Sequence, residues 1–330
     1  METRTIFNQF KELSRSDESR VNVIDIPSLP HKLGMTSEGF PVFFIVTNTT
    51  PFNAQNIERE MLSVQYDMPC TLISDDDEQN NAYSIITLRA SEVSLQSYFI
   101  EIFLMMLGKI PAIPSKRELA IEVENLISIF SALSKPPRKK VQGLWAELLV
   151  IERSLHPETL ISAWHSQANA KYDFTMGRDK IEVKSTSGEE RIHHFSLDQL
   201  NPSPNSRLLI ASVIVRESAQ GSGGMSVRDI YNKICTKVSA NNARLRLYSI
   251  MAECIGSDLT KIDSIFFDYV EASDTLAFFD ANQVPHVEKN SIQPFVSDVS
   301  FSSNLTHLID ISNQQSTFDR SNSPLFKSLF

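Results

Sequence analysis

The chain has 330 residues, of which 42% are hydrophobic, so it can form two compact domains with buried cores, or one large domain with an appendage. The longest apolar run, Phe99 to Leu107, is too short to span a bilayer and contains Glu101. Met1 to Arg20 carry charges throughout and lack the apolar core of a signal peptide, and the cysteines form no C-x-x-C pair. We therefore expect a cytoplasmic globular protein with reduced thiols and no membrane span.

The formal net charge of −9 argues against nucleic-acid binding by the chain as a whole. The charge is unevenly distributed, however. Between Ser134 and Phe195, ten Lys and Arg residues accompany eight acids, so this segment is +2 and the remainder is −11. The segment is the least acidic part of the molecule.

Short β-type runs separated by turn signals predict a small, mostly antiparallel N-terminal domain; they lie at 40–46, 61–66, 70–74 and 82–88. Helices are expected at 92–107 and 115–133, the second starting with a capping box of Ser115 and Glu118. Two prolines and a basic cluster then end that helix. We place an α+β domain at 1–110 and a helical connector with a basic linker at 111–140.

Helical and β-type patterns alternate in the second half, which predicts an α/β core with a mixed sheet at 141–290. In chain order we expect a helix at 141–155, a strand at 161–165, a hairpin at 171–186, a turn at 196–200, a strand at 207–215, helices at 226–239 and 242–255, and β runs within 264–282. The Ser/Asn-rich extension at 291–330 has only weak strand signals.

The hairpin at 171–186 sorts its side chains by charge. Gly177-Arg178 fits a two-residue type II′ turn, and closing the hairpin there places Asp173 opposite Glu182. Strand alternation then separates an apolar face from a charged face. The first face holds Tyr172, Phe174, Ile181 and Val183, and the second holds Lys171, Asp173, Glu182 and Lys184.

Two carboxylates opposite each other on paired strands repel unless a cation compensates them. The candidates are Lys171, Lys184 and a divalent metal, and Mg²⁺ prefers one or two carboxylates together with water and phosphate oxygens. The alternative is a solvated surface hairpin whose acids are merely flanked by lysines.

The helix predicted at 141–155 contributes a third acid. Its apolar residues cover nearly the whole circumference, which favours burial of the helix. Glu147 must then be paired, hydrogen-bonded or close to a cation, because an unpaired buried carboxylate costs several kcal/mol.

Glu147, Asp173 and Glu182-Val183-Lys184 together resemble the signature of the PD-(D/E)XK nuclease superfamily, whose fold is restriction-endonuclease-like. "QGLWAELLVIERSL", "YDFTMGRDKIEVKST" and "HHFSLDQL" more specifically resemble the bacterial group described as PD-(D/E)XK motif proteins. That group occurs in restriction-like phage-defence cassettes. The resemblance covers about residues 138–220 and departs from the pattern at Tyr172, which replaces proline. It implies a mixed sheet flanked by helices.

By this resemblance, Asp173, Glu182 and the Val183 carbonyl hold Mg²⁺ or Mn²⁺. Lys184 orients or activates the attacking water, and Glu147 supports the metal. Contacts with DNA phosphates are expected from Lys135, Arg138, Lys139, Lys140, His194 and Gln199. The alternatives are a solvated linker for the four basic residues and structural roles for the other two.

The leading hypothesis is a metal-dependent DNA endonuclease in a restriction-like phage-defence system, with ATPase, helicase or methyltransferase subunits as the expected kind of partner. The alternative is a non-catalytic subunit of the same fold that binds or scaffolds a defence complex. A third possibility is that the hairpin lies on the surface and forms no site.

Overall fold

The computed structural model describes residues 2–15, 20–73, 78–165, 170–219, 223–312 and 318–329. The chain divides into two compact units, Met1–Ser134 and Lys135–Phe330. Among the described residues, no helix is both long enough and apolar enough to cross a membrane. The three cysteines are free thiols.

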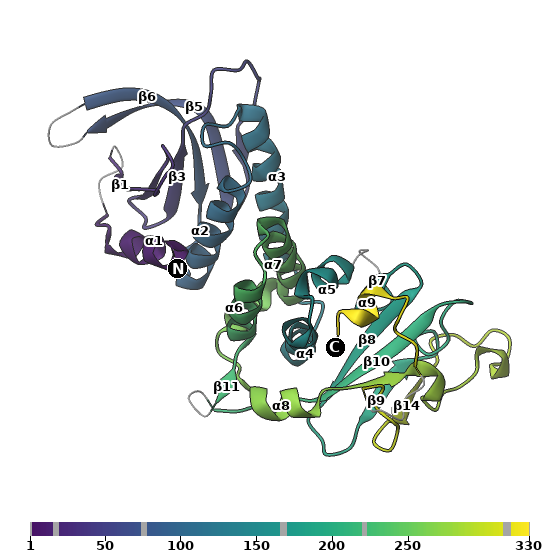
Figure 1. Ribbon diagram of the computed structural model, residues 1–330. Helices are drawn as coiled ribbons and strands as arrows, with labels where there is room; N and C mark the ends of the chain where they lie inside the picture. The colour runs from purple at the N-terminus through teal and green to yellow at the C-terminus, as the bar shows by residue number, and fades with distance from the viewer. Residues whose placement is uncertain are drawn as a thin grey trace. The chain divides into compact units, whose positions relative to one another are not determined.

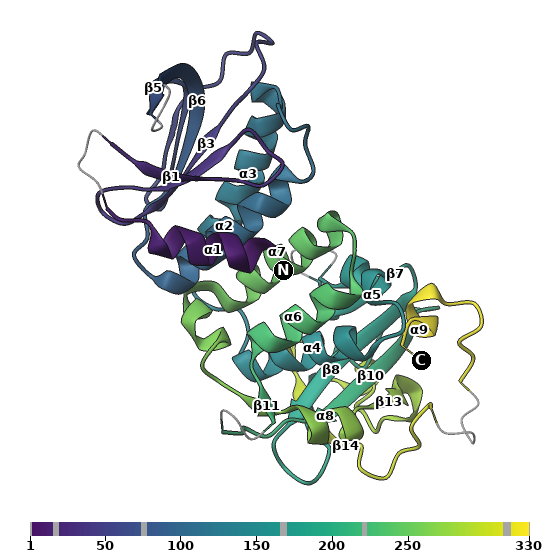
Figure 2. The same cartoon turned by 60° about the vertical axis from the view of Figure 1, so that its left-hand side comes forward.

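The first unit is an antiparallel sheet with helices packed against it (Figure 1, Figure 2). The strands follow the spatial order β1 (Asn22–Asp25), β2 (Lys32–Met35), β3 (Pro41–Ile45), β6 (Glu78–Leu88), β5 (Leu62–Ile73) and β4 (Ile57–Glu58). The helices are α1 (Glu2–Glu12), α2 (Val93–Leu107) and α3 (Lys116–Leu133). This architecture confirms the predicted α+β character of the N-terminal part.

The first unit differs from the prediction in one strand and in the extent of the domain. The strands predicted at 61–66 and 70–74 are one strand, β5, whose register shifts between Gln65 and Met68. Asp67 there has a positive φ of 56°, as the extra residue of a bulge often does. The capping box of Ser115 and Glu118 is present, and α3 belongs to the first unit.

The second unit is built on a four-stranded mixed sheet, as predicted. Its order is β13 (Ala277–Asp280), β10 (Arg207–Ile214), β8 (Asp179–Thr186) and β7 (Phe174–Met176). The strands β8 and β10 run parallel, whereas the β10–β13 and β7–β8 pairs are antiparallel. The sheet order makes β8 a central strand.

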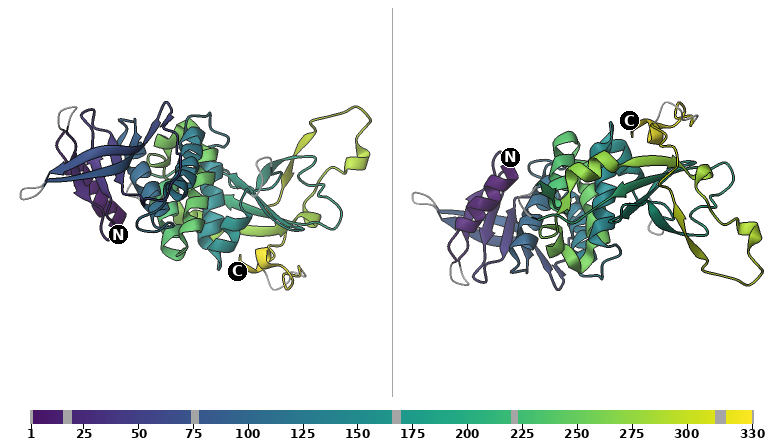
Figure 3. Two further views of the ribbon diagram at one scale, coloured as in Figure 1. Left: turned by 90° about the horizontal axis from the view of Figure 1, so that it is seen from above. Right: turned by 90° about the horizontal axis from the view of Figure 1, so that it is seen from below.

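Helices lie on one side of this sheet and a small second sheet on the other (Figure 3). The helices are α4 (Val141–Arg153), α5 (Pro157–Ala163), α6 (Val227–Lys237) and α7 (Asn241–Ile255). The second sheet pairs β9 (Ile192–Ser196) with β14 (Ser300–Asn304). The remaining elements are β11 (Gly224–Met225), β12 (Phe267–Asp268), α8 (Tyr269–Thr275), α9 (Pro324–Lys327) and 3₁₀ turns at Gly256–Ile262, Ala281–Gln283 and Lys289–Ser291.

Three strand pairs of the hairpin, from Phe174–Ile181 to Met176–Asp179, are those that the sequence predicts, but the strand pairing does not extend to the predicted pair of Asp173 and Glu182 because β7 begins at Phe174. Phe174 pairs with Ile181, and Gly177 opens the turn with a φ of 58°. Phe174 and Ile181 are fully buried on the helix side. Tyr172 instead joins the apolar cluster on the opposite side, with Phe195. Its predicted place beside Phe174 is wrong because strand pairing begins only at Phe174, so alternation does not extend to Tyr172.

Two predicted strands are mainly helical. The segment 161–165 contains the end of α5, followed by an isolated bridge from Trp164 to Phe174. The run from residue 264 forms the short strand β12 and then α8. The Asp268 side chain accepts the backbone N–H of Glu271 at 3.0 Å, so an N-cap starts the helix there despite the β-type residues before it.

Gly256, at the end of α7, is tightly packed against the segment that leads to α4. Its φ is 49°, and a Cβ there would lie 2.2 Å from the Lys135 carbonyl oxygen. We expect Gly256→Ala to lower the free energy of unfolding by at least about 2 kcal/mol, because it combines a left-handed backbone with overpacking. Urea unfolding followed by tryptophan fluorescence measures this, since Trp145 and Trp164, the chain's 2 tryptophans, lie in the second unit.

The matched control is Gly143→Ala. Gly143 lies inside α4, and a Cβ there would meet nothing within 4 Å. This change should be neutral or stabilise the helix by up to about 1 kcal/mol. An equal loss of stability in both variants would contradict the explanation from packing.

Candidate active site

Asp173 lies immediately before β7 and closes the open end of the hairpin. Its Oδ2 accepts the backbone N–H of Val183 at 2.8 Å, which replaces the strand partner that β7 no longer supplies. The N–H and C=O of one strand residue point to the same edge, so the Val183 carbonyl faces this end as well. Asp173 is 6% exposed. A short β7 therefore leaves a buried carboxylate beside an edge carbonyl.

Glu147 is buried in the middle of α4 and has several partners. Its Oε2 accepts Trp164 Nε1–H at 2.7 Å and lies 2.9 Å from His165 Nε2, while its Oε1 contacts the Lys139 ammonium. Burial raises the pKa of this carboxyl, but the His165 and Lys139 contacts outweigh burial and hold the pKa below its ordinary value. The expectation that Glu147 is buried and paired is confirmed.

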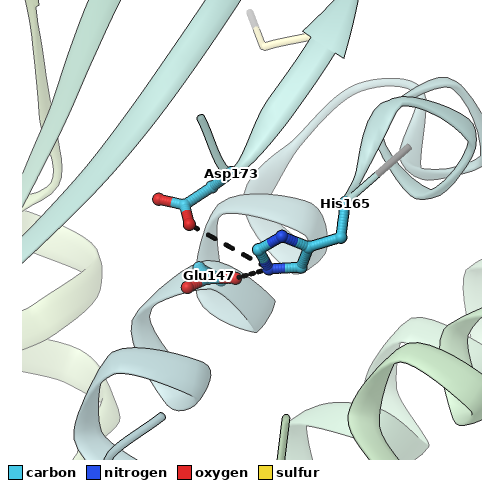
Figure 4. A group of neighbouring side chains, drawn as sticks. All are labelled: Glu147, His165 and Asp173. Carbon is cyan, nitrogen blue, oxygen red and sulfur yellow. Dashed lines mark hydrogen bonds and ion pairs between the residues drawn. The ribbon is translucent and has the colours of Figure 1, made fainter. Parts of the chain in front are cut away.

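Glu147, His165 and Asp173 form a compact group of potential metal ligands (Figure 4). One ligand atom from each residue lies within 4.8 Å of the others, and His165 Nε2 is 4.0 Å from Asp173 Oδ1. His165 has a positive φ of 39°, and its N–H donates to the Asp173 carbonyl at 2.8 Å. The sequence reasoning missed His165, because neither periodicity nor a motif marks it.

Glu182 and Lys184 form the second half of the site, together with Gln199. Lys184 Nζ lies 2.9 Å from Glu182 Oε1, and the same oxygen accepts Gln199 Nε2–H at 2.6 Å. Lys184 also donates to Gln199 Oε1 at 3.2 Å. Burial, and then the nearby Asp173 charge, raise the pKa of Glu182 to about 8. Burial and the Glu147 charge likewise raise the pKa of Asp173.

The cation that compensates Asp173 is Lys139. Its Nζ lies 2.5 Å from Asp173 Oδ1 and also contacts Glu147. Lys171 is one of the predicted candidates, beside Lys184 and a divalent metal, to compensate the two acids, but its Nζ lies 5.0 Å from the Tyr172 ring centroid and 3.4 Å from the Asn201 carbonyl. Lys184 is beside Glu182, in agreement with the prediction.

The residues expected to contact DNA phosphates divide into two groups. Lys139 and Gln199 are half-buried and contact the buried carboxylates described above. The other four are exposed: Lys135, Arg138, Lys140 and His194. Arg138 makes a 3.5 Å ion pair with Glu253, so its charge is partly balanced.

The donor set suits a divalent cation. Two buried carboxylates and one imidazole converge, and a charged ammonium group already lies between the carboxylates. Carboxylate oxygens suit Mg²⁺ and Mn²⁺, and neutral imidazole suits transition metals. Asp173 and Glu182, 6% and 5% exposed, do not lie on a solvated surface, so the hypothesis of a plain surface hairpin is wrong.

Residues 6–306 match a family model described as "Putative PD-(D/E)XK family member, (DUF4420)". No curated protein and no solved structure matches the chain.

Proposed function

The chain belongs to this family of PD-(D/E)XK proteins, and from that premise we propose that it is a metal-dependent nuclease that hydrolyses DNA phosphodiester bonds. The observation that supports the proposal is that four side chains from separate parts of the chain form two nearby ion-paired groups, Glu147 and Asp173 with Lys139, and Glu182 with Lys184. Glu147 comes from α4, Asp173 precedes β7, and Glu182 and Lys184 lie on β8. All three carboxylates are buried, and each has a cationic partner.

In the proposed mechanism, Asp173, Glu182 and the Val183 carbonyl would hold Mg²⁺ or Mn²⁺, and Glu147 would support the metal. A bound divalent cation lowers the pKa of its water ligand and neutralises charge that develops on phosphate. Lys184 is a compact donor whose Nζ is positioned by Glu182 and Gln199. From this position it can orient the attacking water and stabilise negative charge on the phosphate.

DNA is the proposed substrate because exposed basic residues adjoin the catalytic helix. Lys140 is the N-cap residue of α4, and Lys135 and Arg138 precede it. Such residues contact the phosphate backbone without reading sequence. The resemblance of the motif segments to restriction-like proteins supports a role in phage defence, in which partner subunits such as an ATPase, helicase or methyltransferase would act with this chain.

Lys184→Met is the test of the proposed mechanism. Purified protein should cleave or nick DNA when Mg²⁺ or Mn²⁺ is added, and EDTA should stop the reaction. The variant should be at least about a hundredfold slower, because it removes one positioned charge from the transition state. Initial rates on supercoiled plasmid measure the effect.

Lys180→Met is the matched control, since Lys180 lies on the same strand and the same face but donates to the Gly177 carbonyl at the turn. It should cleave at the rate of the unmodified protein. Equal rates for all three proteins would refute the assigned role of Lys184. If none of them cleaves DNA under any metal condition, the alternative of a non-catalytic binding subunit would be favoured.

A further inference from the structure

The Lys139 ammonium contacts two of the three residues that could together hold a metal ion, Glu147 and Asp173. Its Nζ contacts Glu147 Oε1 and lies 2.5 Å from Asp173 Oδ1. Glu147 and Asp173 are also two of the three residues that converge as potential metal ligands. An ammonium group and a divalent ion would therefore compete for oxygen atoms of the same two carboxylates.

The two species compete because the buried carboxylates of Glu147 and Asp173 need a cation beside them. Two neighbouring buried carboxylates destabilise the folded state without a cation, and removing one partner of a buried ion pair leaves an uncompensated buried charge. Lys139 supplies that cation within the chain. Its own burial opposes its charge, yet Asp173 and Glu147 hold the pKa of the ammonium above its ordinary value.

The side chain of Lys139 can leave while its backbone stays fixed. The N–H groups of Arg138 and Lys139 donate to the Cys254 carbonyl at 2.9 and 3.2 Å, which anchors the segment to the end of α7. The Lys139 side chain is 27% exposed and has a flexible stem, so a path to solvent exists. Glu147 remains in place because Trp164 and His165 hold its other oxygen.

We propose that Lys139 is a built-in counter-cation that a divalent metal must displace from Glu147 and Asp173, so that this residue sets the metal affinity of the site. The proposal rests on the proposed metal-dependent function. It also gives the freed ammonium a use, because the displaced side chain would be available to pair with a substrate phosphate. Lys139 thereby differs from Lys184, whose partners are Glu182 and Gln199.

The first experiment measures Mn²⁺ binding by isothermal titration calorimetry and by the EPR signal of free Mn²⁺. Lys139→Met keeps the length of the stem and removes the charge, so we expect it to bind Mn²⁺ about tenfold more tightly than the unmodified protein, a difference of about 1.4 kcal/mol. Lys140→Met removes the neighbouring exposed charge and corrects for a general electrostatic effect. Lys139→Arg retains a cation and should not gain affinity.

The second experiment needs no variant. Acetic anhydride labelling with mass-spectrometric readout should modify Lys139 slowly in EDTA and at least about fivefold faster with saturating Mn²⁺, since ion pairing and burial protect the amine. Lys140, an exposed amine in the same segment, serves as the internal reference.

The outcomes separate this proposal from the proposed function. If the unmodified protein binds Mn²⁺ but Lys139→Met gains nothing over Lys140→Met, and labelling of Lys139 does not respond to Mn²⁺, the role of Lys139 is refuted and the metal site survives. If neither the unmodified protein nor Lys139→Met binds Mn²⁺, the metal site and the counter-cation proposal fail together. Faster labelling with tighter binding supports both.

Discussion

Asp173→Asn should lower the rate of metal-dependent DNA cleavage by about a thousandfold while leaving the fold intact. The reason is that its two carboxylate oxygens have different partners. Oδ2 accepts the Val183 N–H, and an asparagine carbonyl can keep this bond. Oδ1 faces Lys139 and His165, and there an amide group would replace an anionic oxygen. The variant thus loses charge at the metal position alone. Plasmid cleavage kinetics, with thermal melting in EDTA, measure the two effects separately.

A control for this variant is Asp198→Asn, which removes an exposed acid paired with Lys289 at 3.2 Å. It should cleave at the original rate. Full activity in Asp173→Asn would exclude Asp173 as a metal ligand. A large fall in its melting temperature would instead show that the carboxylate charge is needed for the fold.

Glu182→Gln should become increasingly stable relative to the original protein as pH rises. Burial and the Asp173 charge raise the pKa of Glu182 in the folded state to about 8, well above the ordinary value of 4.5 for a glutamate. The folded state therefore binds this proton more tightly than the unfolded state, so the stabilising contribution is complete below about pH 4.5 and is lost as pH rises through about 8. The glutamine side chain does not titrate, so its contribution to stability does not change over this pH range. The stability difference should change in favour of Glu182→Gln by on the order of 3 kcal/mol between pH 5 and pH 9.

Urea unfolding in EDTA, followed by tryptophan fluorescence at a series of pH values, measures this difference. The background variant Asp173→Asn provides the control, because it removes the second cause of the raised pKa. In that background the pH-dependent difference should be smaller, and the double-mutant cycle gives the coupling between the two carboxylates. A difference that stays constant from pH 5 to pH 9 would contradict the raised pKa.

The parts of the site that the sequence predicts are those determined by local patterns. The apolar alternation and the Gly177 turn determine the hairpin register, and the register determines that Glu182 and Lys184 point to one side of β8. The apolar circumference of α4 predicts that Glu147 is buried and paired. Each of these inferences needs only neighbours on one strand or one helix.

The remaining parts depend on how distant segments meet. Lys139 reaches Asp173 across 34 residues of sequence, and His165 reaches Glu147 across 18. The partner of β9 is β14, more than a hundred residues later in a Ser/Asn-rich segment. Contacts of this kind follow from the path of the chain, which periodicity does not specify. The sequence pattern also does not distinguish a basic residue that faces solvent before a helix, such as Lys140, from one that points toward buried carboxylates, such as Lys139.

The length of β7 has a further consequence. The strand begins at Phe174, and before it the Val183 N–H of β8 is bonded by the Asp173 side chain instead of by a strand carbonyl. The site thus depends on the absence of backbone pairing between β7 and β8 before Phe174. A change that extended β7 through Tyr172 would close the edge, withdraw the Val183 carbonyl into ordinary strand pairing and displace the carboxylate, with every acid still in the sequence. A chain could keep the whole motif and lose the site through backbone pairing alone, so strand length deserves the same scrutiny as the acids when family members are compared.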